Sequence, residues 1–377
     1  MLIRYTEKQL LVRDAVRKFT QTELAPRDRK MDNEGFDREI FQKMAELGYF
    51  AHNLPEEYGG ANADHLTTSM IIEEIAKGCG AAALITEAVC LSFGLVHTYA
   101  NEEQKKLLLP LARKGGRLNF ALTEPGGGSD AAGIRTNAVR QADGSWILNG
   151  EKAWITNNDA DYSIICAKTK PDAGARGISA FIIPAGTPGL TAAEPENKVG
   201  MRGVRVGGIA LDNVHVGPEM MIGEENRGFG IAMGVLDVAR VNLAACSVGI
   251  AEHAYDIART YANERKAFGQ SIGKFEGISY KIAEMASRIR MMRLMVYDSA
   301  DNIARPGRHS LDAAQTKLYC TVWATEICRE AMSILGANGT SRDFPVEQLV
   351  RDAKMNEIAD GTPEILRFSI GAQALKG

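Results

Sequence analysis

Apolar residues recur at helical spacing through the first part of the chain. Leu10, Val16 and Phe19 follow a pattern that repeats about every 3.6 residues, with charged residues on the other faces. Pro26 and Gly35 are expected to separate this first helix from the next one. Further helices are predicted over residues 40–47, 69–76, 81–100 and 102–114. Residues 1–117 are therefore predicted to form an N-terminal helical domain.

The pattern changes near Gly115. Between Phe120 and Val216, apolar residues alternate with polar ones or form short runs bounded by turn residues. Asn149 and Gly150 are a common turn pair and are expected to end a strand that begins at residue 146. Strands are predicted over residues 146–148, 164–166, 178–183 and 209–211. Residues 118–226 are therefore predicted to form a central, mostly antiparallel β domain.

Long helical patterns resume after the β domain. Met285 and Met292 belong to a run with strict three- or four-residue spacing, which Arg305-Pro306-Gly307 ends. A second run covers Ala313–Leu335. Long amphipathic helices with short connections indicate an antiparallel bundle, here residues 227–377. The predicted fold class is α+β, with a helical domain, a β domain and a helical bundle in that order.

Composition narrows the possible functions. The 377 residues carry a net charge of −3 and are 45% hydrophobic, which is ordinary for a globular protein of about two or three domains. No basic surface is indicated, so a nucleic-acid partner is not expected. The six cysteines and six histidines lack metal-ligand spacing, so no metal site is expected.

No targeting or transmembrane segment is expected. The N-terminus has a charge every three or four residues, unlike the apolar core of a signal peptide. The most apolar stretch, Gly80–Leu95, is interrupted by Glu87 and falls short of the roughly 20 residues that span a membrane. A cytoplasmic location is the resulting expectation.

Three successive glycines, Gly126 to Gly128, mark the entry to the β domain. Their backbone N–H groups are expected to be open to a bulky anionic group, and Ser129 adds a hydroxyl donor. Such a loop is able to hold a pyrophosphate, although it is neither a GxGxxG nor a Walker loop. An ordinary glycine turn is the alternative interpretation.

Trp154 lies beside Ile155 and Thr156 in a predicted strand region. The indole is able to form a wall against a flat aromatic cofactor, with Thr156 donating to a ring nitrogen. The alternative is an ordinary core tryptophan beside β-branched residues.

Thr362 and Pro363 predict the start of a helix near the C-terminus. The threonine hydroxyl caps the first turn, and proline fits the first helical position. Asp360 comes just before this cap, where its carboxylate is able to act as a general base. A turn aspartate in a solvated loop is the alternative.

Four segments together resemble the acyl-CoA dehydrogenase family. They are TEPGGGSD from Thr123, KAWITN from Lys152, ERKAFGQSIGKFE from Glu264, and LGANGTSRDFPVEQLVRDAK followed by ADGTPEI from Ala359. Their order and spacing match the family across essentially the whole chain. The resemblance implies a C-terminal four-helix bundle, FAD as cofactor, an acyl-CoA substrate in fatty or carboxylic acid catabolism, an electron-transfer flavoprotein as electron acceptor, and a homotetramer.

The resemblance also implies which residues contact the flavin. The β domain would supply Phe120, Leu122, Thr123, Ser129, Trp154, Ile155 and Thr156. A neighbouring subunit would supply Arg265, Phe268, Phe275, Glu276, Ser333, Gly336 and Ala337, which implies an obligate oligomer. Thr362 and Glu364 are carried over as further cofactor contacts. Glu276 and Ser333 depart from the family, which usually has Gln at both positions.

Substrate contacts and a reaction follow from the same resemblance. Asp237 and Arg240 match the pair that contacts CoA, and Ser129, Gly361 and Glu87 complete the expected substrate site. In the family, a carboxylate removes the α-proton of the thioester while the β-hydride passes to flavin N5. A ribityl hydroxyl and the backbone N–H of the base residue hold the thioester oxygen.

The base is the main departure from the family. Asp360 stands where Glu is usual, so its carboxylate stops roughly 1.5 Å earlier, about one C–C bond. Some members carry the base immediately before the CoA-contacting arginine, but that position is Ala239 here. An α-branched or alicyclic substrate, with its proton closer to Asp360, is the favoured explanation.

Three alternatives stay open. Glu87 in the acyl pocket is a second candidate base, although it is equally interpretable as a helix carboxylate that faces solvent or a lysine. The enzyme is otherwise weak, or runs as an enoyl-CoA reductase. A flavin oxidase or monooxygenase on the same fold, and a non-catalytic CoA-binding or assembly protein, are the competing function classes.

Overall fold

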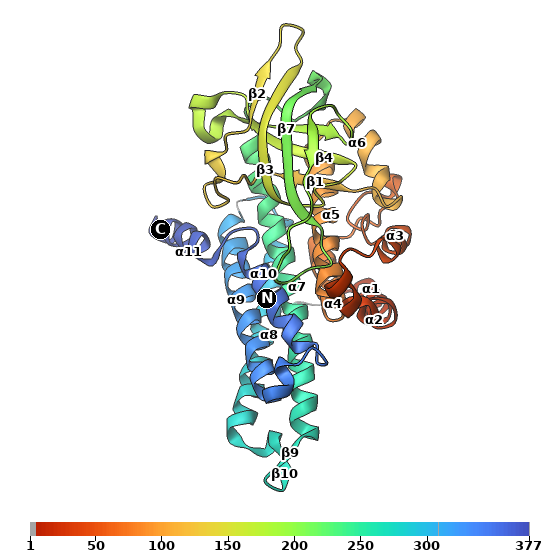
Figure 1. The fold of residues 1–377 in the computed structure, drawn as a ribbon, viewed down its shortest axis with the longest axis vertical. Helices are drawn as coiled ribbons and strands as arrows, with labels where there is room; N and C mark the ends of the chain where they lie inside the picture. Colours follow the sequence, from red (N-terminus) through yellow and green to blue (C-terminus); the bar gives the residue numbers. More distant parts are fainter. Residues whose placement is uncertain (1–4, 308, 377) are drawn as a thin grey trace.

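The N-terminal part of the chain folds into helices that lie beside one end of the C-terminal bundle (Figure 1). The computed structural model describes residues 5–307 and 309–376, so residues 1–4, 308 and 377 of the predicted outer domains lie outside the description. The helices are α1 (Glu7–Phe19), α2 (Ala25–Glu34), α3 (Arg38–Leu47), α4 (His65–Ala76), α5 (Gly80–Tyr99) and α6 (Glu102–Leu108).

The predicted break at Pro26 is wrong. A π-helical turn, Thr20–Leu24, joins α1 directly to α2, and Pro26 lies in the first turn of α2. Proline is tolerated there because the N–H it lacks would have no partner within the helix. Gly35, with a φ of 92°, does end α2 as expected.

The central part forms one sheet. Its strands are β1 (Leu118–Ala121), β2 (Asn137–Arg140), β3 (Trp146–Thr156), β4 (Tyr162–Lys168), β5 (Ile178–Pro184), β6 (Leu190–Ala192), β7 (Val206–Val216) and β8 (Met221–Ile222). They run in the order β6-β7-β3-β2-β4-β5-β8, with β1 beside β4. Most pairs are antiparallel, as predicted, but β4 pairs in parallel with β1 and β2. The turn expected at Asn149 and Gly150 is wrong, because β3 continues through both residues with a register shift against β7.

The C-terminal part is a helical bundle, in agreement with the predicted fold class. It contains α7 (Gly228–Glu264), α8 (Glu276–Ile303), α9 (Ser310–Leu335), α10 (Val346–Ile358) and α11 (Pro363–Ala374). Between α7 and α8, a short hairpin of β9 (Lys266–Ala267) and β10 (Gln270–Ser271) lies at the end of the bundle furthest from the β domain (Figure 1). Helix α7 contacts α4 and α5 as well as α8, α9 and α10, so it joins the two helical parts into one core.

Two of the described helices, α5 and α7, are long and apolar enough to cross a membrane. Helix α5 runs for 20 residues, so the expectation that this stretch falls short of a membrane span is wrong. The most apolar windows of α5 and α7 are 72% and 67% buried inside the protein. Core helices of soluble proteins pass the same test, so these two are weak evidence for a membrane span.

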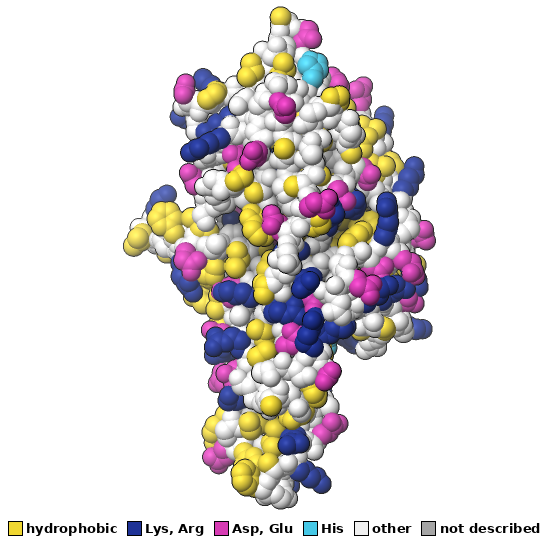
Figure 2. Space-filling view, in the orientation of Figure 1, with side chains coloured by type: hydrophobic (Ala, Val, Ile, Leu, Met, Phe, Trp, Pro, Cys, Tyr) yellow, Lys and Arg dark blue, Asp and Glu magenta, His cyan; other side chains and the backbone are white. Residues whose placement is uncertain are grey.

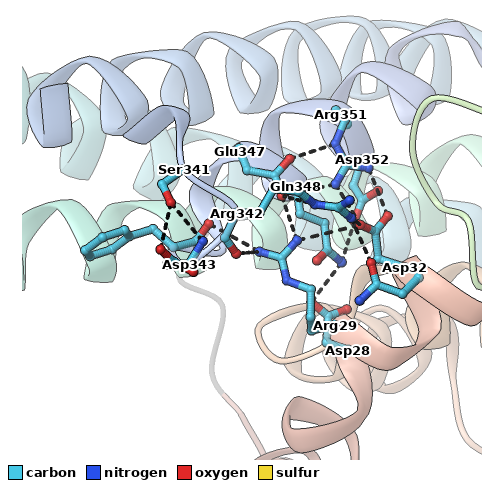
Figure 3. Close-up of polar contacts among 12 residues, drawn as sticks. Asp28, Arg29, Asp32, Ser341, Arg342, Asp343, Glu347, Gln348, Arg351 and Asp352 are labelled. Carbon is cyan, nitrogen blue, oxygen red and sulfur yellow. Dashed lines mark hydrogen bonds and ion pairs between the residues drawn. The ribbon is translucent and has the colours of Figure 1, made fainter. Parts of the chain in front are cut away.

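A group of buried and half-buried charges joins α2 to α10 (Figure 3). We call the group Asp28, Arg29, Asp32, Glu347, Gln348, Arg351 and Asp352 the interdomain clasp. Both amino groups of the Arg351 guanidinium donate to the Asp32 carboxylate, at 2.9 and 2.7 Å, and Arg29 donates to Glu347 at 2.6 Å. Asp352 accepts the backbone N–H of Met201 at 2.5 Å. Bidentate pairs of this kind fix orientation, so the clasp sets the direction in which α10 runs.

Two carboxyl groups in the interdomain clasp are unusually weak acids. Burial raises the pKa of Asp28 to about 6 and that of Asp352 to about 7, and each carboxylate adds repulsion from neighbouring acidic groups. One Asp28 carboxylate oxygen has no hydrogen-bond partner among the described residues. Both carboxyl groups therefore keep a proton at pH values where an exposed aspartate has lost it.

The clasp predicts a pH-dependent stability. Because the pKa of Asp352 is higher in the folded chain than the ordinary value of 3.8, its contribution is complete below about pH 4 and is lost as pH rises to about 7. Asp352→Asn keeps an acceptor for Met201 but does not titrate. We expect the melting temperature of the variant to rise relative to wild type between pH 4 and 7.5, as measured by thermal unfolding. The exposed Asp343→Asn is the matched control, and a constant difference for Asp352→Asn across this range would contradict the assignment.

Candidate active site

The glycine loop follows β1 and is open to solvent. Gly127 has a φ of 147°, and its N–H donates to the Glu124 carbonyl at 3.0 Å, so the expectation of an open N–H is wrong at this glycine. A Cβ at Gly126 or Gly127 would meet no other atom within 4 Å. Packing within the chain therefore does not require glycine here, and the loop leaves room for a bulky group above it. Ser129 is exposed at the end of the loop.

A buried ion pair holds this loop against β3. Lys152 is fully buried, and its ammonium group donates to Glu124 at 2.8 Å and to the Leu122 carbonyl at 3.1 Å. The Glu124 carboxylate also accepts the backbone N–H groups of Arg135 and Thr136. Burial opposes the charge on Glu124, but these hydrogen bonds and Lys152 hold the pKa of its carboxyl below the ordinary value.

Trp154 is presented to solvent by a bulge in β3. The register against β7 shifts between Lys152 and Ile155, and Trp154 has a φ of 60° with 58% of its surface exposed. The interpretation of Trp154 as a core residue is therefore wrong. Ala153 donates to the Thr123 carbonyl at 3.0 Å, which brings the bulge beside the start of the glycine loop. A bulky residue at positive φ is strained, and such strain is commonly found at functional sites.

The predicted flavin residues of the β domain share this region but differ in exposure. Leu122 and Ile155 are buried, whereas Phe120, Thr123 and Thr156 are half-buried. Sequence reasoning assigned no role to Asn157, which also has a positive φ, 55°. Its side-chain amide is buried, and neither its oxygen nor its nitrogen has a partner among the described residues. Buried amides are normally hydrogen-bonded, so Asn157 is available to a polar group from outside the chain.

Asp360 lies in the connection between α10 and α11. It has a φ of 53° and is half-buried, and Arg240 on α7 donates to its backbone carbonyl at 3.1 Å. Arg240 also pairs with Asp237 at 3.2 Å, so the predicted CoA-contacting pair lies beside the candidate base. Thr362 caps α11 by accepting the N–H of Ile365, as predicted. Gly361 and Thr362 are half-buried, whereas Glu364 is exposed.

Glu87 faces Asp360 from the interior of α5. Only 3% of Glu87 is exposed, and one of its carboxylate oxygens has no partner among the described residues. The interpretation of Glu87 as a solvent-facing or lysine-paired residue is therefore wrong. Burial, together with the nearby Asp360 carboxylate, raises the pKa of Glu87 well above its usual range.

The electrostatics at Asp360 are mixed. Burial raises the pKa of the Asp360 carboxyl, whereas the positive charges of Lys317 and Arg240 lower it. Two neighbouring carboxyl groups cannot easily both ionise, so one proton is held between Glu87 and Asp360. This arrangement supplies a base and a protonated acid at the same place.

The remaining predicted flavin residues lie elsewhere. Arg265, Phe268, Phe275, Glu276, Ser333, Gly336 and Ala337 are at the end of the bundle that carries the β9–β10 hairpin, opposite to the β domain (Figure 1). Phe268 is 95% exposed with a φ of 51°, and Arg265, Glu276 and Ser333 are exposed as well. Hydrophobic side chains gather on this end of the bundle in Figure 2. A single chain therefore does not bring these residues to Trp154 or Ser129.

Comparison with known proteins identifies the class to which this fold and site belong. Models of the acyl-CoA dehydrogenase N-terminal, middle and C-terminal domains match residues 6–115, 119–214 and 226–375. The structure superposes on butyryl-CoA dehydrogenase from Megasphaera elsdenii with a TM-score of 0.96, at 35% identity and with 100% of both chains covered. It also superposes on a structure of PigA with FAD and proline, with a TM-score of 0.96 at 26% identity and 100% coverage of both chains.

Sequence relatives agree with the structural neighbours. The probable acyl-CoA dehydrogenase YngJ of Bacillus subtilis is 40% identical, over 98% of this chain and 99% of that protein. Subunit CarC of the caffeyl-CoA reductase-Etf complex of Acetobacterium woodii is 36% identical, over 99% of each. The chain therefore belongs to the acyl-CoA dehydrogenase family. It is an oxidoreductase of the acyl-CoA dehydrogenase type.

The buried Lys152–Glu124 pair makes a testable contribution to this site. Lys152→Met leaves the Glu124 carboxylate buried without its cation, and losing one partner of a buried pair costs about 3–5 kcal/mol. We expect the free energy of unfolding to fall by about that amount in urea titrations. The exposed Lys170→Met is the control, and Glu124→Gln combined with Lys152→Met should recover part of the loss. A Lys152→Met variant as stable as the control would show that the pair does not hold the loop.

Proposed function

We propose that this protein is an FAD-dependent enzyme that removes hydrogen from the α- and β-carbons of an acyl-CoA thioester. The observation that carries the proposal is the placement of Asp360 beside buried Glu87, with its backbone held by Arg240, in a chain of this family. Asp360 takes the α-proton, and electrons pass on to an electron-transfer flavoprotein. The name of the CarC relative, which belongs to an Etf complex, supports that acceptor.

The β-domain residues fit FAD. The open space above Gly126 and Gly127, the exposed Trp154 indole and the unpartnered Asn157 amide are all left unused by the chain itself. Phe120, Leu122, Thr123, Ser129, Ile155 and Thr156 would hold the cofactor there, together with Thr362 and Glu364. When bound, FAD supplies at N5 the acceptor for the hydride that leaves the β-carbon. The solved PigA structure with FAD, which has the same fold, supports this cofactor.

A second copy of the chain completes the cofactor site in this proposal. Arg265, Phe268, Phe275, Glu276, Ser333, Gly336 and Ala337 would reach the FAD of a neighbouring subunit in a homotetramer. The exposure of Phe268 at a position remote from the β domain supports a contact between subunits, because a fully exposed aromatic side chain is costly without a partner. We also propose the domain boundaries 1–117, 118–226 and 227–377 and, on the basis of the bacterial relatives, a cytoplasmic location.

The chain's own residues account for proton removal. Asp237 and Arg240 bind the CoA part, and the backbone N–H at Asp360 holds the thioester oxygen, with Gly361 and Ser129 also lining the substrate site. Burial makes Asp360 a stronger base than an exposed aspartate, since its pKa is raised. Because its side chain is shorter than Glu, an α-branched or alicyclic acyl group is the proposed substrate class. Glu87, protonated, is placed to limit the acyl pocket or to exchange the proton with Asp360.

Reduction of an enoyl-CoA is the second candidate. The observation that favours it is the name of the CarC relative, which is a reductase. An oxidase or monooxygenase would instead consume oxygen when substrate reduces the flavin, and a non-catalytic protein would show no flavin reduction at all. Measuring oxygen uptake during turnover separates these classes.

Asp360→Asn tests the base assignment. Asparagine tolerates the positive φ of this position, so FAD and thioester binding should be unchanged. Loss of a general base should slow flavin reduction by about 100-fold or more, measured by anaerobic stopped-flow absorbance. Glu87→Gln is the matched variant and should retain most of the rate. If Asp360→Asn reduces flavin normally and Glu87→Gln does not, the base is Glu87.

Arg265→Ala tests the contribution of a second subunit to the cofactor site. The variant should purify with less FAD than wild type, as measured by the ratio of flavin to protein absorbance. Lys266→Ala, an exposed neighbour in the same hairpin, is the control and should keep its FAD. Full FAD occupancy in Arg265→Ala would contradict the proposed contact.

A further inference from the structure

Lys317 is a lysine in the interior of the bundle. It lies in the middle of α9 with none of its surface exposed. Its ammonium group donates to two backbone carbonyls, those of Glu357 at 2.8 Å and Gly361 at 2.6 Å. Glu357 is in the last turn of α10 and Gly361 directly follows Asp360, so one buried cation bonds the chain on both sides of the candidate base.

The position of Lys317 accounts for the cost of burying its charge. The last carbonyls of a helix have no partner within the helix and carry partial negative charge, which a cation stabilises. Arg240 donates to the carbonyl of Asp360 itself at 3.1 Å. The carbonyls of Glu357, Asp360 and Gly361 are thus held by cations from α9 and α7. This hold keeps Asp360 in its left-handed conformation, with a φ of 53°.

The charges around Lys317 and Asp360 come from every neighbouring helix. Burial lowers the pKa of Lys317 to about 8, assisted by Arg240 on α7 and opposed by Asp360, Glu357 on α10 and Glu364 on α11. Glu87 on α5 faces Asp360 and acts on its charge in the direction opposite to Lys317. Lys317 and Arg240 are the positive groups that act on the Asp360 carboxyl, and Arg240 is already paired with Asp237.

We propose that Lys317 is a positioning residue for the catalytic base, because it fixes the backbone around Asp360 and its charge favours the ionised carboxylate beside Glu87. The inference rests on the proposed role of Asp360 as the base. A short aspartate side chain leaves little room for error, since a misplacement of about 1 Å can cost on the order of 100-fold in rate. The rigid hold on both neighbouring carbonyls compensates for that shortness.

Two variants separate the two contributions of Lys317. Lys317→Gln keeps hydrogen-bond donors but removes the charge, and Lys317→Met removes both. Lys354→Met is the matched control, because Lys354 is an exposed lysine on α10 that pairs with the side chain of Glu357. Each full-length FAD-loaded protein is compared with wild type in the pH profile of kcat/KM for flavin reduction. Deuterium exchange of the backbone amides of residues 359–366 is measured without substrate.

The expected results differ between the variants. In Lys317→Gln, the acid limb of the profile moves to higher pH, because a lost positive charge raises the pKa of Asp360. The limb near pH 8 that wild type owes to Lys317 itself disappears. In Lys317→Met, kcat falls by about 100-fold and amide exchange around Asp360 accelerates. Lys354→Met matches wild type in both measurements.

A Lys317→Gln profile that superimposes on wild type, together with unchanged exchange in Lys317→Met, would overturn the proposal. If Lys317→Met does not fold, the Lys317→Gln profile decides alone. If no thioester reduces the wild-type flavin, the proposed function fails, and the exchange measurement still reports whether Lys317 holds the Asp360 segment.

Discussion

The hold on α10 and on the segment after it is the constraint on which the site depends. At the start of α10, Arg351 and Asp352 fix the helix to α2 and to Met201 through the interdomain clasp. At its end, Lys317 and Arg240 bind the backbone carbonyls around Asp360. A carboxylate at a left-handed position between two helices has no regular structure of its own to orient it. Its direction is therefore set by charged side chains from α2, α7 and α9.

The distribution of the candidate flavin residues connects assembly with function. Trp154 and Ser129 are exposed on the β domain, whereas Arg265 and Phe268 are exposed at the opposite end of the bundle. Neither group is satisfied within one chain. A homotetramer that brings the hairpin of one subunit to the β domain of another would cover Phe268 and complete the cofactor site at the same time. In this account, loss of assembly and loss of FAD are one event.

Local patterns predicted much of the fold, and tertiary placement limited the rest. The change of period near residue 115 and the Thr362-Pro363 cap depend on neighbouring residues alone, and both agree with the structure. Glu87 could not be placed, because α5 is apolar on nearly all faces and the sequence does not show which neighbour a lone carboxylate meets. Trp154 is exposed by a bulge that depends on pairing with β7. Lys317 resembles an ordinary charged position in an amphipathic helix until α10 is placed against it.

Reduction of the bound flavin by a panel of CoA thioesters tests the central claim most directly. Straight-chain, α-branched, alicyclic and aryl-substituted thioesters would be mixed anaerobically with the FAD-loaded protein, and bleaching of the flavin absorbance followed. The account predicts bleaching, fastest with α-branched or alicyclic acyl groups that bring the α-proton closer to the short side chain of Asp360. A flavin that no thioester in the panel reduces would contradict it.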